Sequence, residues 1–572
     1  MKSMKKLMLV GLVLLASVMV LVGCKNDSVP ETPKYTVTFD KNAEDATGEM
    51  DSQTFTQGEK KELPANAFVR PTWTFSGWST NKEATTHEYG DKAQFSVTKD
   101  TTLYAIWTEN AVDPVTFSRR DGTKFFYNES FIVFLATTTE GATIKYKLDD
   151  GDWQDYDGKI ILTSNTTITA KATKEGLKDS EETRATYTIR ELTSITITPL
   201  RTLYSVGERV DSTAMVVTVK YDDGESLTFK GGTIDNATSS LTETAGVKEV
   251  IVSYSEGEKT VTATFTVNVV DPSIPTRLEN YISPNDTDDR WTYVAFGEWP
   301  QSKAQDFTPK TEAKSYGFFE NNYYEEADGK YVQQGEQYYT VEPIVWRVLN
   351  KDYDTTGKAL LLAEKILIGG IPYYVDHNNT RTITGGGTKE GEQNTVYPNN
   401  YKYSTIRAWL NGSYEADDTQ EKNYEGKGFL QTAFTDGALE FIVDTTVDNT
   451  AWSTNTGMDA KMWDSGNNSY ACENTIDKIF LLSEQEATYP VYGFDIYVEW
   501  AWGRSNTLIR VNTDYAKDTW EPGWWGLRSP SHKFTYYARN IRSNGYAISY
   551  IDVESLQGGV VPALCVSASD IK

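Results

Sequence analysis

Short segments of alternating polar and apolar residues constrain this chain more than any other feature. They are rich in Thr, Val, Ile and Tyr and include YTVTFDKN, ATIKYKL, TTITAKAT, TSITITP, MVVTVKY and TVTATFTVNVV. A period of two is typical of half-buried antiparallel strands, and the Gly, Asp and Asn residues between the segments favour turns. We therefore predict that the first half of the chain is almost free of helix. A chain of 572 residues is also too long for one hydrophobic core, so several domains are expected.

The charge balance argues against one class of partner. The chain has 81 acidic and 55 basic residues, a formal net charge of -26, and no basic stripe interleaved with aromatic residues. It should repel phosphate backbones, so no nucleic-acid partner is expected. Its 35 Tyr and 15 Trp residues are more than small β-domain cores require, which favours surfaces that bind through rigid amphipathic rings.

The N-terminus predicts export. Three lysines precede an apolar run from Leu7 to Val22, which is shorter than the roughly 20 residues that a membrane-spanning helix needs. Residues 1–24 are therefore interpreted as a signal peptide. The ending LVGC resembles the bacterial lipobox, which implies that Cys24 is acylated and that its lipid anchors the protein in a membrane of the bacterial cell envelope. The alternative is an uncleaved anchor or a coincidental cysteine.

The remaining cysteines and the histidines indicate no metal chemistry. An exported compartment permits a disulfide between Cys472 and Cys565, and buried free thiols are an equal alternative. The three histidines, His87, His377 and His532, are isolated in the sequence, and no zinc-type spacing occurs. Neither a metal site built on imidazole nor a cofactor is expected.

Three β-modules follow a linker at residues 25–34. Residues 35–110 resemble the internalin-type B repeat (Listeria–Bacteroides repeat), a β-grasp-like module, through YTVTFDKN, FVRPTWTFSGWSTN and DTTLYAIW. Residues 111–190, with GATIKYKLDDGDWQDYDG, resemble the Ig-like domain of chitobiase C-terminal type. Residues 191–272, with ITITPLRTLYSVGERVDSTAMVVTVKYDDGE, resemble a bacterial Ig-like domain. Together these resemblances imply a stalk.

Two local predictions concern these modules. A module as small as the first needs large side chains in its core, and four aromatic residues are the candidates: Trp73, Phe75, Trp78 and Trp107. In the second module, LDDGDW is predicted to form a tight turn after which Trp153 folds back onto the sheet.

The sequence pattern changes after residue 272, and residues 273–572 are predicted to form an α+β domain. YSTIRAWL is interpreted as the start of a helix, with Ser404 as N-cap and with Ile406, Trp409 and Leu410 on one face. The strings YVAFGEWPQ, VEPIVWRVLN, ALLLAEKIL, DKIFLLSEQEA and VVPALCVS are interpreted as strands or short buried elements.

The order of these strings resembles an uncharacterised bacterial domain over residues 291–567. Its marks are an FG-x-x-PQ start, a P-I-x-WRVL strand, an S-x-I-R-x-WLN helix, an F-LLS-x-x-E segment, a WWLRSP stretch and a GVRPAL end. The resemblance implies a C-type-lectin-like fold nearest to the formylglycine-generating-enzyme type. Gly526 interrupts the WWLRSP string, and Val561 replaces the usual Arg of the last motif, which is expected to remove an ion pair.

The stretch WWGLRSPSHKFTYYARNIRSNGYAISYIDVESLQGG is predicted to face a ligand. It resembles segments that retroelements diversify by mutating the adenines of AAC codons, and many of its residues, Ile551 among them, are reachable from AAC. The predicted ligand-binding residues are His532, Phe534, Thr535, Tyr536, Tyr537, Tyr546, Ile548, Ser549, Tyr550 and Asp552. The alternative is that Tyr546, Ile548 and Tyr550 alternate because one face of a strand is buried.

Two functions remain open. The first is a lipid-anchored surface protein whose C-terminal domain binds a protein or glycan on another cell or surface. The second is an enzyme that acts on carbohydrate or protein, with the Ig-like units as spacers. Cysteine oxidation of the formylglycine type is not supported, because only Cys565 lies near the C-terminus and Cys472 is remote. No catalytic constellation stands out, so we predict no catalytic residues and no enzyme activity. The acidic run from Asn285 to Arg290 is interpreted as a solvated linker rather than a calcium loop.

Overall fold

Two compact units make up the chain, Met1–Arg190 and Glu191–Lys572. The computed structural model describes residues 31–210, 212, 215–235, 241–285, 290–304, 307–317, 320–389, 391–415, 422–454, 468–494, 497–499, 502–545 and 547–572. The predicted signal peptide with Cys24, Tyr546, the side chain of Ile548 and most of the acidic run after Asn285 lie outside the description.

Strands dominate both units, which confirms the prediction of a multidomain, mostly β protein. In the part of the chain described here, the first α-helix begins at Thr405, so the expected lack of helix in the first half is also confirmed. Within the same residues, no helix has both the length and the apolar surface that crossing a membrane requires.

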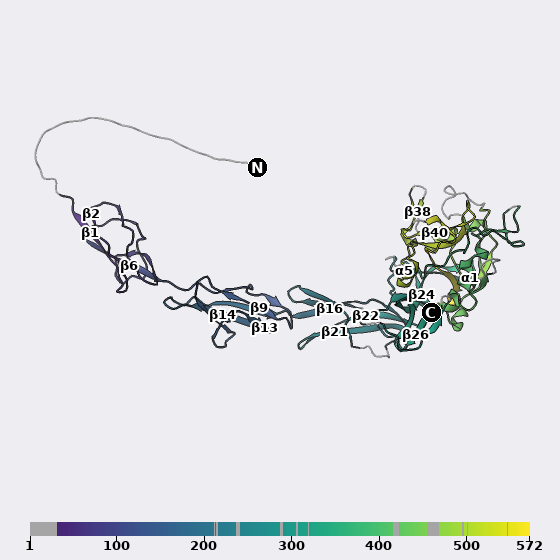
Figure 1. Ribbon diagram of the computed structural model, residues 1–572, viewed down its shortest axis with the longest axis horizontal. Helices are drawn as coiled ribbons and strands as arrows, with labels where there is room; N and C mark the ends of the chain where they lie inside the picture. Colours follow the sequence, from purple (N-terminus) through teal and green to yellow (C-terminus); the bar gives the residue numbers. More distant parts are fainter. Residues whose placement is uncertain are drawn as a thin grey trace, which may run out of the picture. The chain divides into compact units, whose positions relative to one another are not determined.

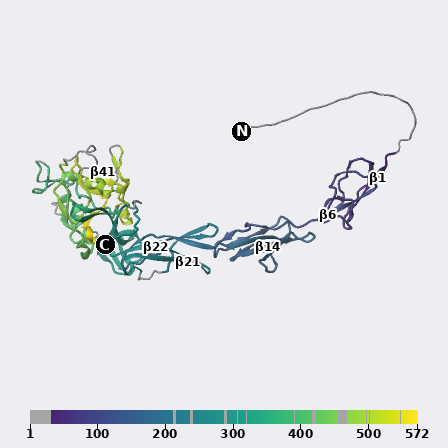
Figure 2. The same cartoon turned by 180° about the vertical axis from the view of Figure 1, so that it is seen from behind.

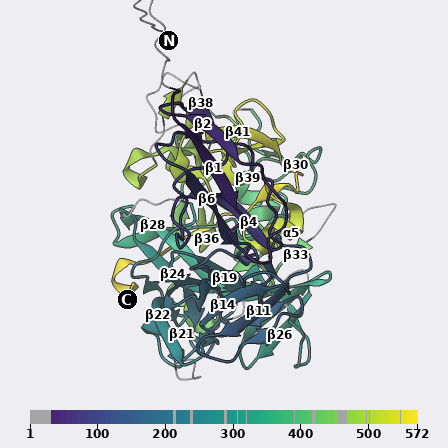
Figure 3. The same cartoon turned by 90° about the vertical axis from the view of Figure 1, so that its left-hand side faces the viewer.

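The first module is built on one mixed sheet. Its strands are β1 (Lys34–Asp40), β2 (Gln53–Thr56), β3 (Lys61–Glu62), β4 (Trp73–Ser79), β5 (Gln94–Phe95) and β6 (Thr101–Glu109). The order in the sheet is β2-β1-β6-β4, with β1 and β6 parallel (Figure 3), and β3 pairs with β5.

The core of this module forms around Trp78, which is fully buried. The Phe75 ring packs 4.8 Å from Trp78 and 5.8 Å from Trp107. The prediction that Trp73 belongs to this core is wrong. Trp73 begins β4 at the edge of the sheet, and its ring lies 3.8 Å from the Arg70 guanidinium, outside the hydrophobic cluster.

The second module has a five-stranded sheet and two short strand pairs. The sheet order is β12 (Gln154–Asp155), β11 (Thr143–Leu148), β14 (Thr166–Thr173), β15 (Thr183–Ile189) and β8 (Lys124–Phe125). The pairs are β7 (Thr116–Phe117) with β10 (Leu135–Ala136), and β9 (Phe131–Val133) with β13 (Ile160–Leu162).

The predicted LDDGDW turn joins β11 to β12. Asp149 has a φ of 49°, and the Gly151 N–H donates to the Leu148 carbonyl oxygen at 2.9 Å. Trp153 folds back onto the sheet as predicted, with the amines of Lys147 and Lys171 at 5.6 and 5.3 Å from its ring centroid.

The third module has two sheets. One contains β16 (Leu192–Thr198), β18 (Val216–Tyr221) and β19 (Ser226–Lys230), and the other has the order β17 (Leu203–Ser205), β22 (Lys259–Val270), β21 (Gly246–Glu256) and β20 (Thr233–Ile234). The hairpin of β21 and β22 is visible from both sides in Figures 1 and 2. Alternate residues such as Val250, Val252, Val267 and Val269 are buried, which is the period-two pattern of the sequence.

The C-terminal domain is built on a nine-stranded sheet. Its strands are β23 (Thr276–Arg277), β24 (Tyr293–Lys303), β25 (Lys314–Tyr316), β26 (Asn321–Glu326), β27 (Gly329–Gln334), β28 (Gln337–Tyr353), β29 (Lys358–Ala363), β36 (Ile479–Phe480) and β43 (Ala563–Ser567). Every predicted strand string of this domain lies in one of them or overlaps one. β29 is central and nearly all apolar, because both of its faces are covered.

A second sheet of this domain has the order β41-β40-β39-β42. Its strands are β39 (Trp524–Pro530), β40 (Tyr537–Arg542), β41 (Ala547–Asp552) and β42 (Gly558–Gly559). Four two-stranded ribbons complete the described strands: β30 (Arg381–Thr382) with β31 (Thr395–Val396), β32 (Tyr414–Glu415) with β33 (Lys422–Asn423), β34 (Thr445–Val447) with β35 (Thr475–Asp477), and β37 (Tyr497–Glu499) with β38 (Trp502–Arg504).

The helices of the domain are short. They are α1 (Thr405–Asn411), α2 (Phe429–Ala433), α3 (Asp436–Leu439), α4 (Glu484–Thr488) and α5 (Asp514–Trp520), with 3-10 turns at Tyr401–Tyr403, Ala451–Thr454, Pro490–Tyr492, Asn506–Leu508 and Ala568–Asp570. The predicted helix is α1, and Ser404 caps it by accepting a hydrogen bond from the Arg407 N–H. Side chains from both sheets and from α1, α2, α4 and α5 form one hydrophobic core.

Candidate binding site

The candidate site lies on the second sheet of the C-terminal domain, at residues that were predicted from the sequence to bind a ligand. β40 and β41 are antiparallel, with Tyr537 opposite Asp552 and Arg539 opposite Tyr550. Opposite residues in an antiparallel pair project to the same face, and alternate residues along a strand share it. These four side chains therefore start from one face of the β40–β41 pair.

Two buried polar side chains hold the loop before β40. Ser531 Oγ accepts hydrogen bonds from the N–H groups of Lys533 and Phe534, at 3.1 and 3.3 Å. Asn399 is fully buried, and its Nδ2 donates to the carbonyl oxygens of Phe534 and Tyr537, at 2.8 and 3.2 Å. Sequence reasoning missed Asn399, because no local pattern marks a contact 135 positions away.

The aromatic face consists of Phe534, Tyr536, Tyr537 and His377. Ring centroids lie 5.2 Å apart for Phe534 and Tyr537, and 4.7 Å apart for Tyr536 and Tyr537. The His377 ring is 5.9 Å from Tyr536. Phe534 is 40% exposed, and the other three are half-buried. The rings therefore hold one another in place while part of each meets solvent.

A second cluster surrounds Tyr550. The Arg539 guanidinium lies 4.3 Å from the Tyr550 ring centroid, and Arg539 Nη2 is 3.1 Å from His532 Nδ1. Arg539 Nε also forms a buried ion pair with Glu484 Oε2 at 2.9 Å. Burial raises the pKa of Glu484 to about 7, although the guanidinium opposes that rise. The cluster links the predicted surface to the domain interior.

The other predicted residues have different environments. Ser549 is 9% exposed, and its hydroxyl accepts hydrogen bonds from Arg542 Nε and Nη2 at 3.2 and 3.0 Å. Thr535 is half-buried, and its carbonyl oxygen accepts the Asn399 N–H at 3.1 Å. Tyr546, Ile548 and Tyr550 are the residues whose alternation could reflect a buried strand face. The structure describes the side chain of Tyr550, which is half-buried.

Three potential metal ligands meet beside the aromatic face. His377 Nδ1 lies 3.3 Å from Asp552 Oδ2 and 3.1 Å from Glu554 Oε2. All three side chains are half-buried. His377 is isolated in the sequence but meets two carboxylates in the fold, and neither His377 nor Glu554 is among the predicted site residues.

Cys472 and Cys565 are both buried free thiols. Burial raises the pKa of Cys472 to about 11 and that of Cys565 to about 12, so each remains protonated at neutral pH. Of the two alternatives that the sequence left open, the structure has the unpaired thiols.

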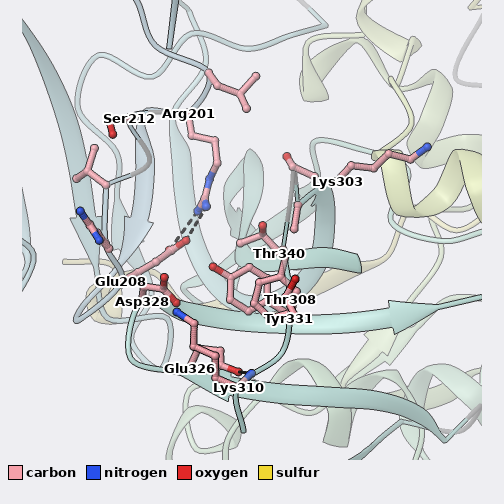
Figure 4. A pocket seen from close by; sticks show the side chains of 16 residues that line it. Arg201, Glu208, Ser212, Lys303, Thr308, Lys310, Glu326, Asp328, Tyr331 and Thr340 are labelled. Carbon is pink, nitrogen blue, oxygen red and sulfur yellow. Dashed lines mark hydrogen bonds and ion pairs between the residues drawn. The ribbon is translucent and has the colours of Figure 1, made fainter. Parts of the chain in front are cut away.

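A cavity of about 380 Å³ lies where the third module meets the C-terminal domain (Figure 4). Arg201 and Glu208 both line the cavity, and the Arg201 guanidinium points toward the Glu208 carboxylate. The Nη1–Oε1 and Nη2–Oε2 distances are 2.6 and 3.1 Å. Lys303 extends away toward α5, where its Nζ is 2.7 Å from Asp518.

Two carboxylates of this cavity, those of Glu208 and Glu326, already have partners. Burial raises the pKa of Glu208, whereas Arg201 and the Ser205 N–H favour its charged form. Glu326 accepts hydrogen bonds from the Lys310 and Thr311 N–H groups, which lower its pKa. The cavity therefore has the chemistry of a domain junction.

Three family models match parts of the chain. Residues 356–568 match a domain of unknown function (DUF6273). Residues 35–106 match the Listeria-Bacteroides repeat domain, and residues 197–269 match a bacterial Ig-like domain (group 3). The aromatic face and its neighbouring carboxylates thus lie within residues 356–568, which the DUF6273 model matches. No curated protein matches this sequence.

Several solved structures resemble parts of the chain weakly. The D00-D0 domain of intimin has 13% identity and a TM-score of 0.14, covering 27% of this chain and 100% of its own. Invasin, a bacterial integrin-binding protein, has 11% identity and a TM-score of 0.15, covering 79% and 100%. The surface layer protein SbsC, domains 4–9, has 11% identity and a TM-score of 0.17, covering 87% and 82%. TM-scores this low do not establish a shared arrangement.

Proposed function

We propose that this chain is a lipid-anchored protein of the bacterial cell surface. In this proposal acylated Cys24 holds it in the membrane, and three β-modules carry a C-terminal domain that binds a protein or glycan partner. The apolar N-terminal segment that ends in LVGC, the Listeria-Bacteroides repeat and the bacterial Ig-like domain support it. Binding without catalysis, and without nucleic acid, is part of the proposal.

The aromatic face is the observation that carries the binding role. Phe534 and Tyr536 come from the loop before β40 and Tyr537 begins β40. The buried Asn399 donates hydrogen bonds to the carbonyl oxygens of Phe534 and Tyr537. Rigid rings contribute large contact areas and lose little side-chain entropy on binding. A loop held on a rigid scaffold is also a frequent position for recognition residues. The C-type-lectin-like fold and diversification by a retroelement stay predictions.

The test removes one ring of the aromatic face at a time from the full chain. We expect Phe534→Ala and Tyr536→Ala to weaken attachment of protein-coated beads to epithelial cells or to a printed glycan array. Central aromatic anchors typically contribute about 2 kcal/mol or more, which corresponds to about thirtyfold in affinity.

The matched control is Tyr127→Ala in the second module. Tyr127 is 39% exposed and Phe534 is 40% exposed, so the two substitutions remove similarly accessible rings. The control should attach like the unmodified chain. Attachment that Phe534→Ala and Tyr536→Ala leave unchanged, with circular dichroism spectra intact, would reject this surface.

A further inference from the structure

Side chains from two distant segments bring three metal-ligand atoms together at the end of β41. The Tyr374 N–H donates to the Val553 carbonyl oxygen at 2.9 Å, which fixes the chain before His377 against the chain around Asp552 and Glu554. One ligand atom from each of His377, Asp552 and Glu554 lies within 4.8 Å of the other two.

Backbone N–H groups orient both carboxylates. The His377 N–H donates to Glu554 Oε1 at 2.7 Å, and the Glu554 N–H donates to Asp552 Oδ1 at 3.1 Å. Each carboxylate therefore has one oxygen held by the backbone. The second oxygen, Oε2 of Glu554 or Oδ2 of Asp552, is the one that faces the imidazole. Such supporting hydrogen bonds are typical of groups that orient metal ligands.

The His377 ring nitrogen Nδ1 faces two carboxylate oxygens. Nδ1 is shielded from solvent and has no hydrogen-bond partner of acceptable geometry. An imidazole with its proton on Nε2 would direct the Nδ1 lone pair at two negatively charged oxygens, which is repulsive. A proton on Nδ1 can form one linear hydrogen bond at a time, whereas a metal ion satisfies all three atoms together.

The two distances from the imidazole nitrogen match a coordination shell. Metal–ligand distances of about 2.0–2.2 Å place neighbouring donors about 2.8–3.1 Å apart in octahedral geometry and about 3.3–3.6 Å apart in tetrahedral geometry. The separations from Nδ1 to the two carboxylate oxygens are 3.3 and 3.1 Å. We propose that His377, Asp552 and Glu554 bind a divalent transition-metal ion, and Zn²⁺ is the ion with which we test the site.

The ligand set distinguishes among cations. An imidazole nitrogen suits Zn²⁺ and its first-row neighbours, whereas Ca²⁺ and Mg²⁺ prefer shells made of oxygen. Three protein ligands leave at least one position for water or for an oxygen atom of a bound partner. This site goes beyond the proposed binding function and does not depend on it.

The test measures Zn²⁺ binding to the full chain, purified in detergent and stripped with a chelator. Titration calorimetry with ZnCl2 should detect a site that Asp552→Asn, Glu554→Gln and His377→Ala each weaken at least about tenfold. The two amide variants retain the oxygen that accepts the backbone N–H, so they remove charge and leave the turn intact.

His87→Ala is the control, because it removes an exposed imidazole from the first module. It should bind Zn²⁺ like the unmodified chain, and Co²⁺ added to the stripped chain should give visible absorption bands that the three site variants lose. Absence of Zn²⁺ binding in the unmodified chain would overturn the proposal. Equal affinity in that chain and in the three site variants would overturn it as well.

Discussion

Charged residues from several C-terminal motifs lie inside the domain, paired with one another. Arg347 of the WRVL string forms an ion pair with Glu364 at 2.6 Å, and both side chains are fully buried. Arg528 of the interrupted WWLRSP string pairs with Glu486 of the LLS-x-x-E string. Removing one partner of such a pair leaves a buried charge, which typically destabilises a protein by about 3–5 kcal/mol. Each of these motif charges therefore neutralises a buried partner inside the domain, whereas the aromatic face is where we propose that recognition occurs.

The Glu484–Arg539 pair makes a pH prediction at this scale. Burial raises the pKa of Glu484 from 4.5 to about 7, so the folded chain binds this proton more tightly than the unfolded chain does. The contribution of Glu484 to the free energy of unfolding is therefore complete below pH 4.5 and is lost as the pH rises through 7.

Glu484→Gln should abolish this dependence. The difference in unfolding free energy between the unmodified chain and the variant should decrease between pH 5 and pH 8, by up to about 3 kcal/mol. Urea unfolding followed by tryptophan fluorescence measures it. A difference that stays constant over this range would show that Glu484 has the same pKa in both states.

At the scale of elements, α1 illustrates how local signals and packing combine. Ser404 Oγ accepts the Arg407 N–H at 3.3 Å and donates to the Tyr401 carbonyl oxygen at 2.8 Å. The helix ends at Gly412, whose φ is 59° and whose missing side chain leaves room for Gln431. Both ends are therefore determined by residues of the printed sequence, while the buried Trp409 attaches the helix to the core.

Ser404→Ala should lower the free energy of unfolding by about 1 kcal/mol, because the first turn loses its capping acceptor. The hydroxyl is buried, so water replaces it poorly. Ser404→Thr keeps the hydroxyl and should lose much less, as measured by urea denaturation of both variants. Equal losses in the two variants would mean that packing at this position, and not the cap, is what matters.

At the scale of the whole molecule, the third module and the C-terminal domain share a buried polar junction. Arg201 pairs with Glu208 of its own module, and its Nε lies 3.6 Å from Glu342 Oε1 in β28. Ser205 Oγ donates to Glu298 Oε1 of β24 at 2.8 Å. These contacts fit the division of the chain, which keeps this module and the C-terminal domain in one unit.

Arg201→Ala should loosen this junction, because Glu208 and Glu342 lose the cation between them. The expected loss is about 3–5 kcal/mol in local stability. Hydrogen exchange followed by mass spectrometry should be faster in β17 and in the N-terminal part of β28, and unchanged in β11 of the other unit. Lys310→Ala removes an exposed cation of the same cavity and serves as the control. Unchanged exchange in β17 would contradict this role for Arg201.

The sequence by itself determined the strands, the predicted turn and the start of α1, because period-two alternation, turn residues and caps act over a few neighbouring positions. It also marked Phe534, Tyr536 and Tyr537 as surface candidates. Only the tertiary structure decided that Asn399 holds their loop and that Trp73 lies outside its core. It also decided that His377 meets Asp552 and Glu554. Such contacts join residues up to 177 positions apart, and their geometry depends on how the sheets and loops pack rather than on any local pattern.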